Sequence, residues 1–120
     1  MPRRSSRITR RKLHNPHAAS APYDEWLIQS LKDPLEAAAY LEAAIEDGDQ
    51  AGLMLALRHV AQAQGGVAEI ARKSRLTREA TYRMLSENGN PELKSLTAVL
   101  AAAGLRLSVK PIEARPKKAA

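Results

Sequence analysis

The sequence predicts an all-α domain of five helices followed by one short β-strand, in a chain of 120 residues. Apolar residues recur at three- and four-residue steps through most of residues 23–103, which is the period of a helix. The apolar set is mainly Ala, Leu, Ile and Val, Phe is absent, and Trp occurs once, a composition that favours helices. Residues 105–109 alternate apolar and polar, which is the period of a strand.

Helix-capping residues define the expected ends of the first helices. Residues 23–31 place their apolar side chains on one face and form a short segment ahead of the first full helix. Asp33 is the expected N-cap of that helix, with Pro34 at its first position. Gly48 ends it, and Asp49 caps the next helix.

Glycines and prolines separate the later elements. Gly65 and Gly66 end the second helix, and the Asn88–Pro91 stretch is a strong turn signal. Thr77 is the expected N-cap of the fourth helix, and Gly104 ends the fifth. The third, fourth and fifth helices are expected over residues 67–74, 78–86 and 93–103.

The net charge of +6 is distributed unevenly along the chain. Residues 1–20 carry six bases and no acid, residues 21–66 carry eight acids and two bases, and residues 67–120 carry eleven bases and five acids. Such asymmetry favours one surface for phosphates and another kept away from them. We expect a disordered basic arm over residues 1–20, a folded domain over 21–110 and a disordered tail over 111–120. The arm has two interpretations, a transit peptide or a loose DNA-binding arm, and the second suits the rest of the chain better.

Composition also excludes several classes of protein. Without Cys the chain has no disulfide and no thiolate metal site, and a reducing compartment is expected. No apolar run approaches the roughly 18 residues that a membrane span needs. The basic N-terminus lacks the apolar stretch of a secretory signal. We therefore expect a cytoplasmic protein with no membrane partner.

Two short helices with a tight link predict a helix-turn-helix over residues 67–85. Leu76 is expected to anchor the turn in the core, and Thr81 to lie at the margin of the buried stripe. The expected inner residues are Ile70, Ala71, Ala80, Met84 and Leu85. The residues left on the outer face of the second helix are Arg78, Glu79, Tyr82, Arg83 and Ser86.

That outer face suits the major groove of DNA, which admits one helix whose N-terminal side chains reach base edges. Arg78 can donate to guanine, and Glu79 can accept from cytosine. Tyr82 and Arg83 suit either a phosphate or a thymine methyl group. The expected DNA-binding residues, with two phosphate contacts included, are Thr77, Arg78, Glu79, Tyr82, Arg83 and Lys94. The alternative is a packed helix pair with a charged exterior.

Several stretches together resemble a known family, the addiction-module antidotes of the lambda-repressor-like superfamily, which include HigA-like antitoxins and prophage regulators. The matching stretches are Asp33–Glu42, Ile45–Asp49, Leu76–Ser86, Gly89–Pro91 and Leu100–Leu107. The resemblance implies a lambda-repressor-like helix-turn-helix fold and a homodimer that represses transcription from its own operator. It also implies a cognate toxin similar to the small RelE/ParE ribonucleases or gyrase poisons.

Two residues depart from the superfamily's pattern. Arg75 occupies the turn position where many relatives have Gly, and a left-handed conformation there costs a non-Gly residue about 1 kcal/mol. Val67 stands where many relatives begin the first of the two helices with a phosphate-binding Gln. We expect the fold to survive both changes.

Nothing in the sequence indicates an enzyme, a cofactor, a metal or a small-molecule substrate. His59 is the one His of the expected domain, and no catalytic constellation accompanies it. The acids around Gly48 do not match the spacing of a calcium loop, and a helix end followed by a new cap explains them better.

The segment containing Tyr23, Trp26 and Leu27 has two interpretations. It either packs as a lid on the first two helices or forms part of a toxin-binding surface, since Trp and Tyr are favoured interface residues. The acidic residues of the following helices suit a basic toxin.

The strand containing Leu105, Leu107 and Val109 has no partner strand in its own chain. Either it frays, or it pairs with its copy in a second chain. We expect antiparallel pairing across a two-fold axis, which sets two recognition helices about one DNA turn apart.

The sequence alone leaves two alternatives to an antitoxin. One is a prophage-type transcriptional regulator without a toxin, and the other is a protein-interaction module that does not bind DNA. The arginines of the predicted outer face argue against the second.

Overall fold

The computed structural model describes residues 21–113, which form six α-helices and, within that range, no β-strand. The helices are α1 (Ala21–Ser30), α2 (Pro34–Asp47), α3 (Gln50–Ala63), α4 (Val67–Ser74), α5 (Arg78–Met84) and α6 (Leu93–Ala102). The all-α class is confirmed. The expected number of five helices is wrong by one, because residues 21–30 form a complete helix. The expected basic arm, and residues 114–120 of the expected tail, lie outside the described residues.

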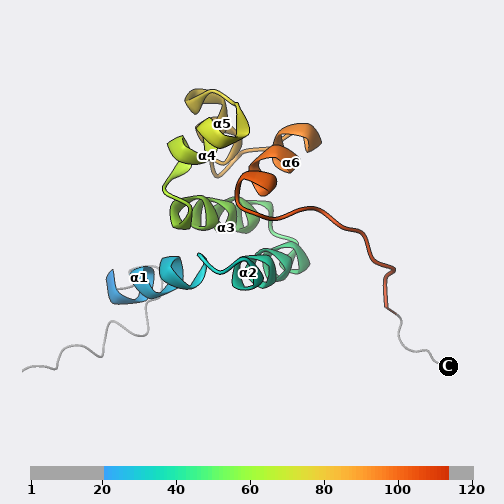
Figure 1. Ribbon diagram of the computed structural model, residues 1–120. Helices are drawn as coiled ribbons and strands as arrows, with labels where there is room; N and C mark the ends of the chain where they lie inside the picture. Colours follow the sequence, from blue (N-terminus) through green and yellow to red (C-terminus); the bar gives the residue numbers. More distant parts are fainter. Residues whose placement is uncertain (1–20, 114–120) are drawn as a thin grey trace, which may run out of the picture.

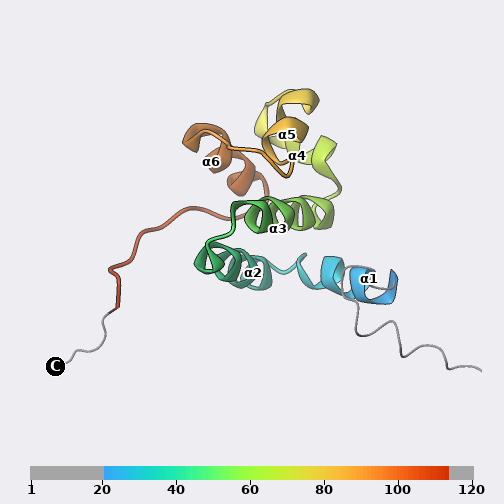
Figure 2. The same ribbon diagram turned by 180° about the vertical axis from the view of Figure 1, so that it is seen from behind.

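Helix α3 separates two tiers of helices. Helices α1 and α2 lie along one side of it, and α4, α5 and α6 lie on the other (Figures 1 and 2). It packs against α1, α2 and α4, while α4 packs in turn against α5 and α6. Because α3 faces both tiers, its buried residues are numerous: Met54, Ala56, Leu57, Val60, Ala61 and Ala63. The eight acids of residues 21–66 lie on α1, on α2 and in the links that follow these two helices.

The ends of α2 and the start of α3 follow largely from the sequence. Asp33 Oδ1 accepts a hydrogen bond of 3.0 Å from the backbone N–H of Leu35, with Pro34 in the first position of α2. Gly48 ends α2 in the left-handed conformation at φ +77°, as Gly does most readily. Asp49 occupies the N-cap position of α3, but its side chain makes no capping hydrogen bond. Two of these three expected caps are therefore confirmed in full.

The strand expected over Leu105–Val109 is not formed. Helix α6 ends at Ala102, and just beyond it Gly104 adopts φ +83°, so that the N–H of Leu105 donates to the carbonyl of Leu100 at 2.8 Å. The chain then runs on to residue 113 without secondary structure, and no other described segment lies beside it as a strand. Pairing needs a second strand to accept and donate the ladder hydrogen bonds, and one chain supplies none here. The alternating pattern was therefore insufficient evidence for a strand within one chain.

Candidate nucleic-acid interface

The link between α4 and α5 is a three-residue turn with one residue in the left-handed region. Arg75 has φ +62°, the only positive φ among the described residues other than glycine. Its N–H donates to the carbonyl of Arg72 at 3.2 Å, and the N–H of Leu76 donates to that of Ala71 at 3.0 Å. These two bonds close α4 as a Schellman motif, which normally has Gly at this position. The structure confirms that this position needs the left-handed conformation, and it packs Leu76 against the core.

Helix α5 is fixed to the core by one face. Thr77 caps it, its Oγ1 accepting from the N–H of Ala80 at 3.0 Å, as the sequence predicts. Thr81 and Leu85 are fully buried, whereas Ala80 and Met84 are only partly so. The prediction that Thr81 lies at the margin of the stripe is wrong. Its hydroxyl donates to the Thr77 carbonyl at 2.8 Å, and this bond satisfies the polar group inside the core.

Helix α5 ends at Met84, two residues earlier than expected, because contacts from α3 hold the chain that follows. The Arg58 guanidinium donates to the carbonyl of Leu85, and Gln50 Nε2 donates to the carbonyl of Gly89 at 2.8 Å. A Cβ at Gly89 would lie 2.0 Å from the Met84 carbonyl oxygen, so the turn accepts only glycine there. The role of Arg58 was not predicted from the sequence. Its place within the apolar stripe of α3 was the available signal.

The outward face of α5 is uncovered. Arg78, Glu79, Tyr82 and Arg83 are all exposed, and their side chains make no hydrogen bond or ion pair with any residue of 21–113. Thr77 is exposed at the start of the same helix. Lys94 is exposed in the first turn of α6, across the Asn88–Pro91 turn from α5. The structure thus brings five of the six predicted DNA-binding residues to one helix and leaves Lys94 on another.

Positive charge dominates the α4–turn–α5 unit, defined as residues 67–86. The unit holds five bases and two acids. One of the acids, Glu69, pairs with Arg72 at 2.5 Å, and this hydrogen bond lowers the pKa of Glu69 below its usual value. The other bases of the unit have no ion-pair partner among the described residues. The unit therefore presents a net positive surface, with the acidic tier on the far side of α3 (Figure 1).

The residues predicted for toxin contact do not form one exposed surface. Trp26 is 63% exposed on α1, whereas Leu27 is buried in the core beside Leu31. The side chain of Tyr23 lies outside the described residues. Leu27 therefore fixes α1 on the core, and of the two described side chains Trp26 is the exposed one.

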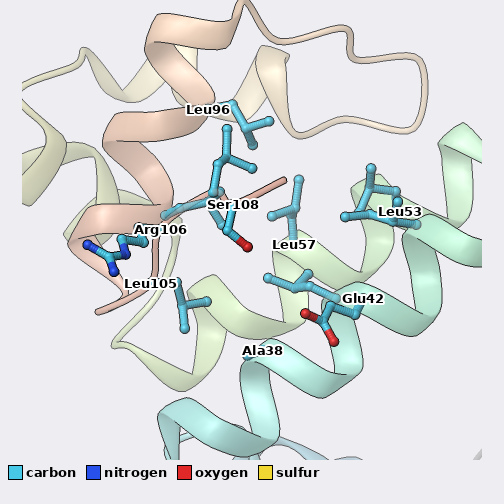
Figure 3. Close-up of a pocket in the computed structure, with 12 residues that line it drawn as sticks. Ala38, Glu42, Leu53, Leu57, Leu96, Leu105, Arg106 and Ser108 are labelled. Atoms are coloured by element: carbon cyan, nitrogen blue, oxygen red, sulfur yellow. The ribbon is translucent and has the colours of Figure 1, made fainter. Parts of the chain in front are cut away.

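A small apolar cavity lies under the start of the C-terminal segment (Figure 3). It has a volume of about 150 Å³ and opens between α2, α3 and α6. Its lining residues are Ala38, Leu41, Glu42, Ile45, Leu53, Leu57, Leu96, Leu100, Leu105, Arg106, Leu107 and Ser108. Leu105 is partly buried there, while Leu107 and Val109, the other two residues predicted for dimerisation, are exposed.

His59 belongs to a polar contact between α2 and α3. A hydrogen bond of 2.7 Å joins its Nδ1 to the Tyr40 hydroxyl. Burial lowers the pKa of His59, an effect that the Asp24 carboxylate opposes and the Arg58 guanidinium reinforces. Across residues 21–113, no group of three or more His, Asp or Glu side chains is arranged to hold a metal ion. None of the described helices is both long enough and apolar enough to cross a membrane.

These features define a small all-helical protein with an uncovered, positively charged helix face. The model of one family, described as the probable addiction module antidote protein family, matches residues 25–111, and the chain belongs to that family. Membership indicates an antitoxin role and a toxin partner. No curated protein and no solved structure matches the chain.

Proposed function

We propose that this antidote is a transcriptional autorepressor whose α4–turn–α5 unit is a helix-turn-helix for operator DNA. The observation that carries the proposal is the contrast between the two faces of α5. Thr81 and Leu85 are fully buried, while Arg78, Tyr82 and Arg83 point outward without partners among the described residues. The inner face of α5 is thus packed into the core, and its outer face is open to solvent and to a partner.

The B-DNA major groove, about 12 Å wide, admits a single helix whose first residues meet the base edges. Arg78 is the first residue of α5, so its guanidinium is placed to donate to guanine O6 and N7. Glu79 follows it and is placed to accept from a cytosine amine. Tyr82 and Arg83, one turn later, suit a backbone phosphate or a thymine methyl group. Thr77 and Lys94 supply further phosphate contacts.

Replacing Arg78 by Ala tests this proposal. The variant should lose about 1–3 kcal/mol of binding free energy, and the loss should be concentrated at one base pair of the operator. Binding is measured by gel shift and fluorescence anisotropy on a duplex from the promoter of the chain's own gene and on a scrambled duplex of equal composition. Lys32→Ala is the control, because Lys32 is an exposed cation in the link between α1 and α2.

The two duplexes give separate outcomes. An equal loss on both, with Lys32→Ala unchanged, would mean that Arg78 holds a phosphate instead of a base. Failure of the unaltered protein to prefer its promoter over the scrambled duplex would overturn the autorepressor proposal.

The toxin partner that family membership indicates is, in this proposal, a small basic protein similar to the RelE/ParE toxins. Residues 21–66 supply eight acids against two bases, and all eight acids lie on α1, on α2 or in the links that follow them, in the tier on the far side of α3 from α5. Trp26 stands exposed on that tier, and an aromatic side chain of this kind is a frequent anchor in interfaces. A basic toxin would therefore bind α1 and α2 without reaching the DNA-binding face.

The chain is further proposed to act as a homodimer joined through residues 105–109. Leu107 is half exposed and Val109 is 96% exposed, although both are large apolar residues. Leu107 lines the apolar cavity, and Val109 follows it on the segment without secondary structure that continues from there. A second copy of the segment would supply the missing strand partner and cover these side chains. Two-fold pairing would also present two α5 helices to successive major grooves, about 34 Å apart.

A further inference from the structure

The fold places an arginine where glycine would be more stable. Arg75 ends α4 at φ +62°, a region that L-residues adopt at a cost and that glycine adopts freely. Gly48 and Gly104 end α2 and α6 in the same left-handed region. The chain therefore uses glycine at two comparable positions and not at this one.

The Arg75 side chain stabilises no contact in the described part of the molecule. It is exposed and makes no hydrogen bond or ion pair with residues 21–113. The two hydrogen bonds that close α4 come from backbone N–H groups, so glycine would make them equally well. The arginine is thus unnecessary for the turn and carries a conformational cost within it.

Arg75 lies next to the start of the proposed recognition helix, and this position indicates a role in DNA binding. It lies two residues before Thr77, the N-cap of α5, and three before Arg78. Lys73, two residues before Arg75 in the last turn of α4, is also exposed and without an ion-pair partner among these residues. The acid of α4, Glu69, is already paired with Arg72, so the nearest carboxylate of that helix does not compete for Arg75.

We propose that Arg75 binds a phosphate of the DNA backbone at the edge of the groove that α5 enters, and so sets the position of α5. This inference rests on the proposed DNA-binding function. A guanidinium donates two parallel hydrogen bonds to one phosphate, which makes arginine better suited than lysine or a neutral residue to fixing a helix on the duplex. The backbone strain is then retained because it places this donor group beside the recognition helix.

Replacing Arg75 by Gly should change the stability of the fold and the affinity for DNA in opposite directions. The Tm should rise, because the left-handed conformation suits glycine. The DNA affinity should fall about tenfold at low salt, as expected for one lost charge-assisted contact. The log–log salt dependence should flatten by about 0.9 for each bound chain, and equally on the promoter and scrambled duplexes, because phosphates carry no sequence information. Thermal melts and anisotropy titrations from about 50 to 200 mM salt measure these three changes.

Two further variants complete the test. Arg75→Lys should keep most of the salt dependence, and Lys32→Ala, which removes one exposed charge from the far tier, should change neither affinity nor slope. An Arg75→Gly protein that binds DNA with unaltered affinity and slope would overturn this inference, while the Arg78→Ala result would still support the proposed function. If the unaltered protein binds neither duplex, the proposed function fails, and this inference fails with it.

Discussion

His59 shows how one half-buried side chain makes stability depend on pH. It lies between Tyr40 of α2, Asp24 of α1 and the neighbouring Arg58, and burial is the largest influence on its pKa. Burial favours the neutral imidazole, so the folded state binds a proton less readily than the unfolded state, whose value is near 6.5.

Stability should therefore be complete above about pH 6.5 and should fall as the pH drops from there towards the lower pKa of the folded state. Replacing His59 by Gln should flatten this part of the profile. Urea unfolding at several pH values between about 7.5 and 5.5, above the range in which most carboxylates titrate, measures the effect. Tyr40→Phe is the matched control. It removes the hydrogen bond and keeps the burial, so the pH dependence should persist. A profile that is as steep in His59→Gln as in the unaltered protein would contradict this account.

Individual residues were predictable where their partners are close in sequence. Asp33 and Thr77 bond to backbone N–H groups two and three residues ahead, and the sequence alone identified both caps. Arg75 was expected in the left-handed region only because related proteins have Gly at that position, and its φ of +62° agrees. Arg58 was not assigned a role, because its partner, the Leu85 carbonyl, is 27 residues away and is brought near only by the packing of α3.

At the scale of elements, the spacing of apolar residues located the helices well, and the capping residues and glycines located most of their ends, because these signals act locally. Helix α5 was predicted too long, since its end depends on contacts from Gln50 and Arg58 on α3. The C-terminal strand was predicted from alternation alone. Alternation describes which side chains face the same way, but a strand also needs a neighbour, and the sequence does not specify one.

The exposed C-terminal segment yields a prediction about assembly. The protein should sediment as a dimer at micromolar concentration, and Val109→Asp combined with Leu107→Asp should convert it to a monomer, because charges would be buried between two apolar strands. Ile112→Asp is the matched control. Ile112 is as exposed as Val109 but lies beyond the proposed strand, so this variant should remain a dimer.

Analytical ultracentrifugation measures these states, and circular dichroism checks that the helices remain. A monomeric unaltered protein would rule out the strand-paired dimer. Dissociation by Ile112→Asp alone would place the interface further along the chain.

The whole molecule separates two kinds of charge. Acids concentrate on α1, α2 and their links, and the unpaired bases concentrate on the α4–turn–α5 unit, with α3 between them (Figures 1 and 2). Binding of a basic toxin and binding of DNA should therefore be independent at the level of contact surfaces.

Replacing Trp26 by Ala should weaken binding of the cognate toxin by at least about 2 kcal/mol, if Trp26 is a central anchor. The same variant should leave DNA affinity unchanged, and Arg78→Ala should do the reverse. Titration calorimetry measures the affinity for the toxin, and fluorescence anisotropy measures the affinity for the duplex. Leu93→Ala is the control, because Leu93 is also an exposed apolar residue but lies on α6 in the other tier. Toxin binding that survives Trp26→Ala and is lost in Leu93→Ala would move the toxin site to the upper tier.

The division of α5 into a buried and an uncovered face also bears on how antidotes of this family would diverge if they repress their own genes as proposed. The side chains of Arg78, Glu79, Tyr82 and Arg83 are exposed and make no hydrogen bond or ion pair in the described part of the chain, so they can change without disturbing the core. Duplicated copies of such a gene could acquire different operators through a few substitutions, at little risk of misfolding. Two modules in one cell would then regulate themselves without cross-talk.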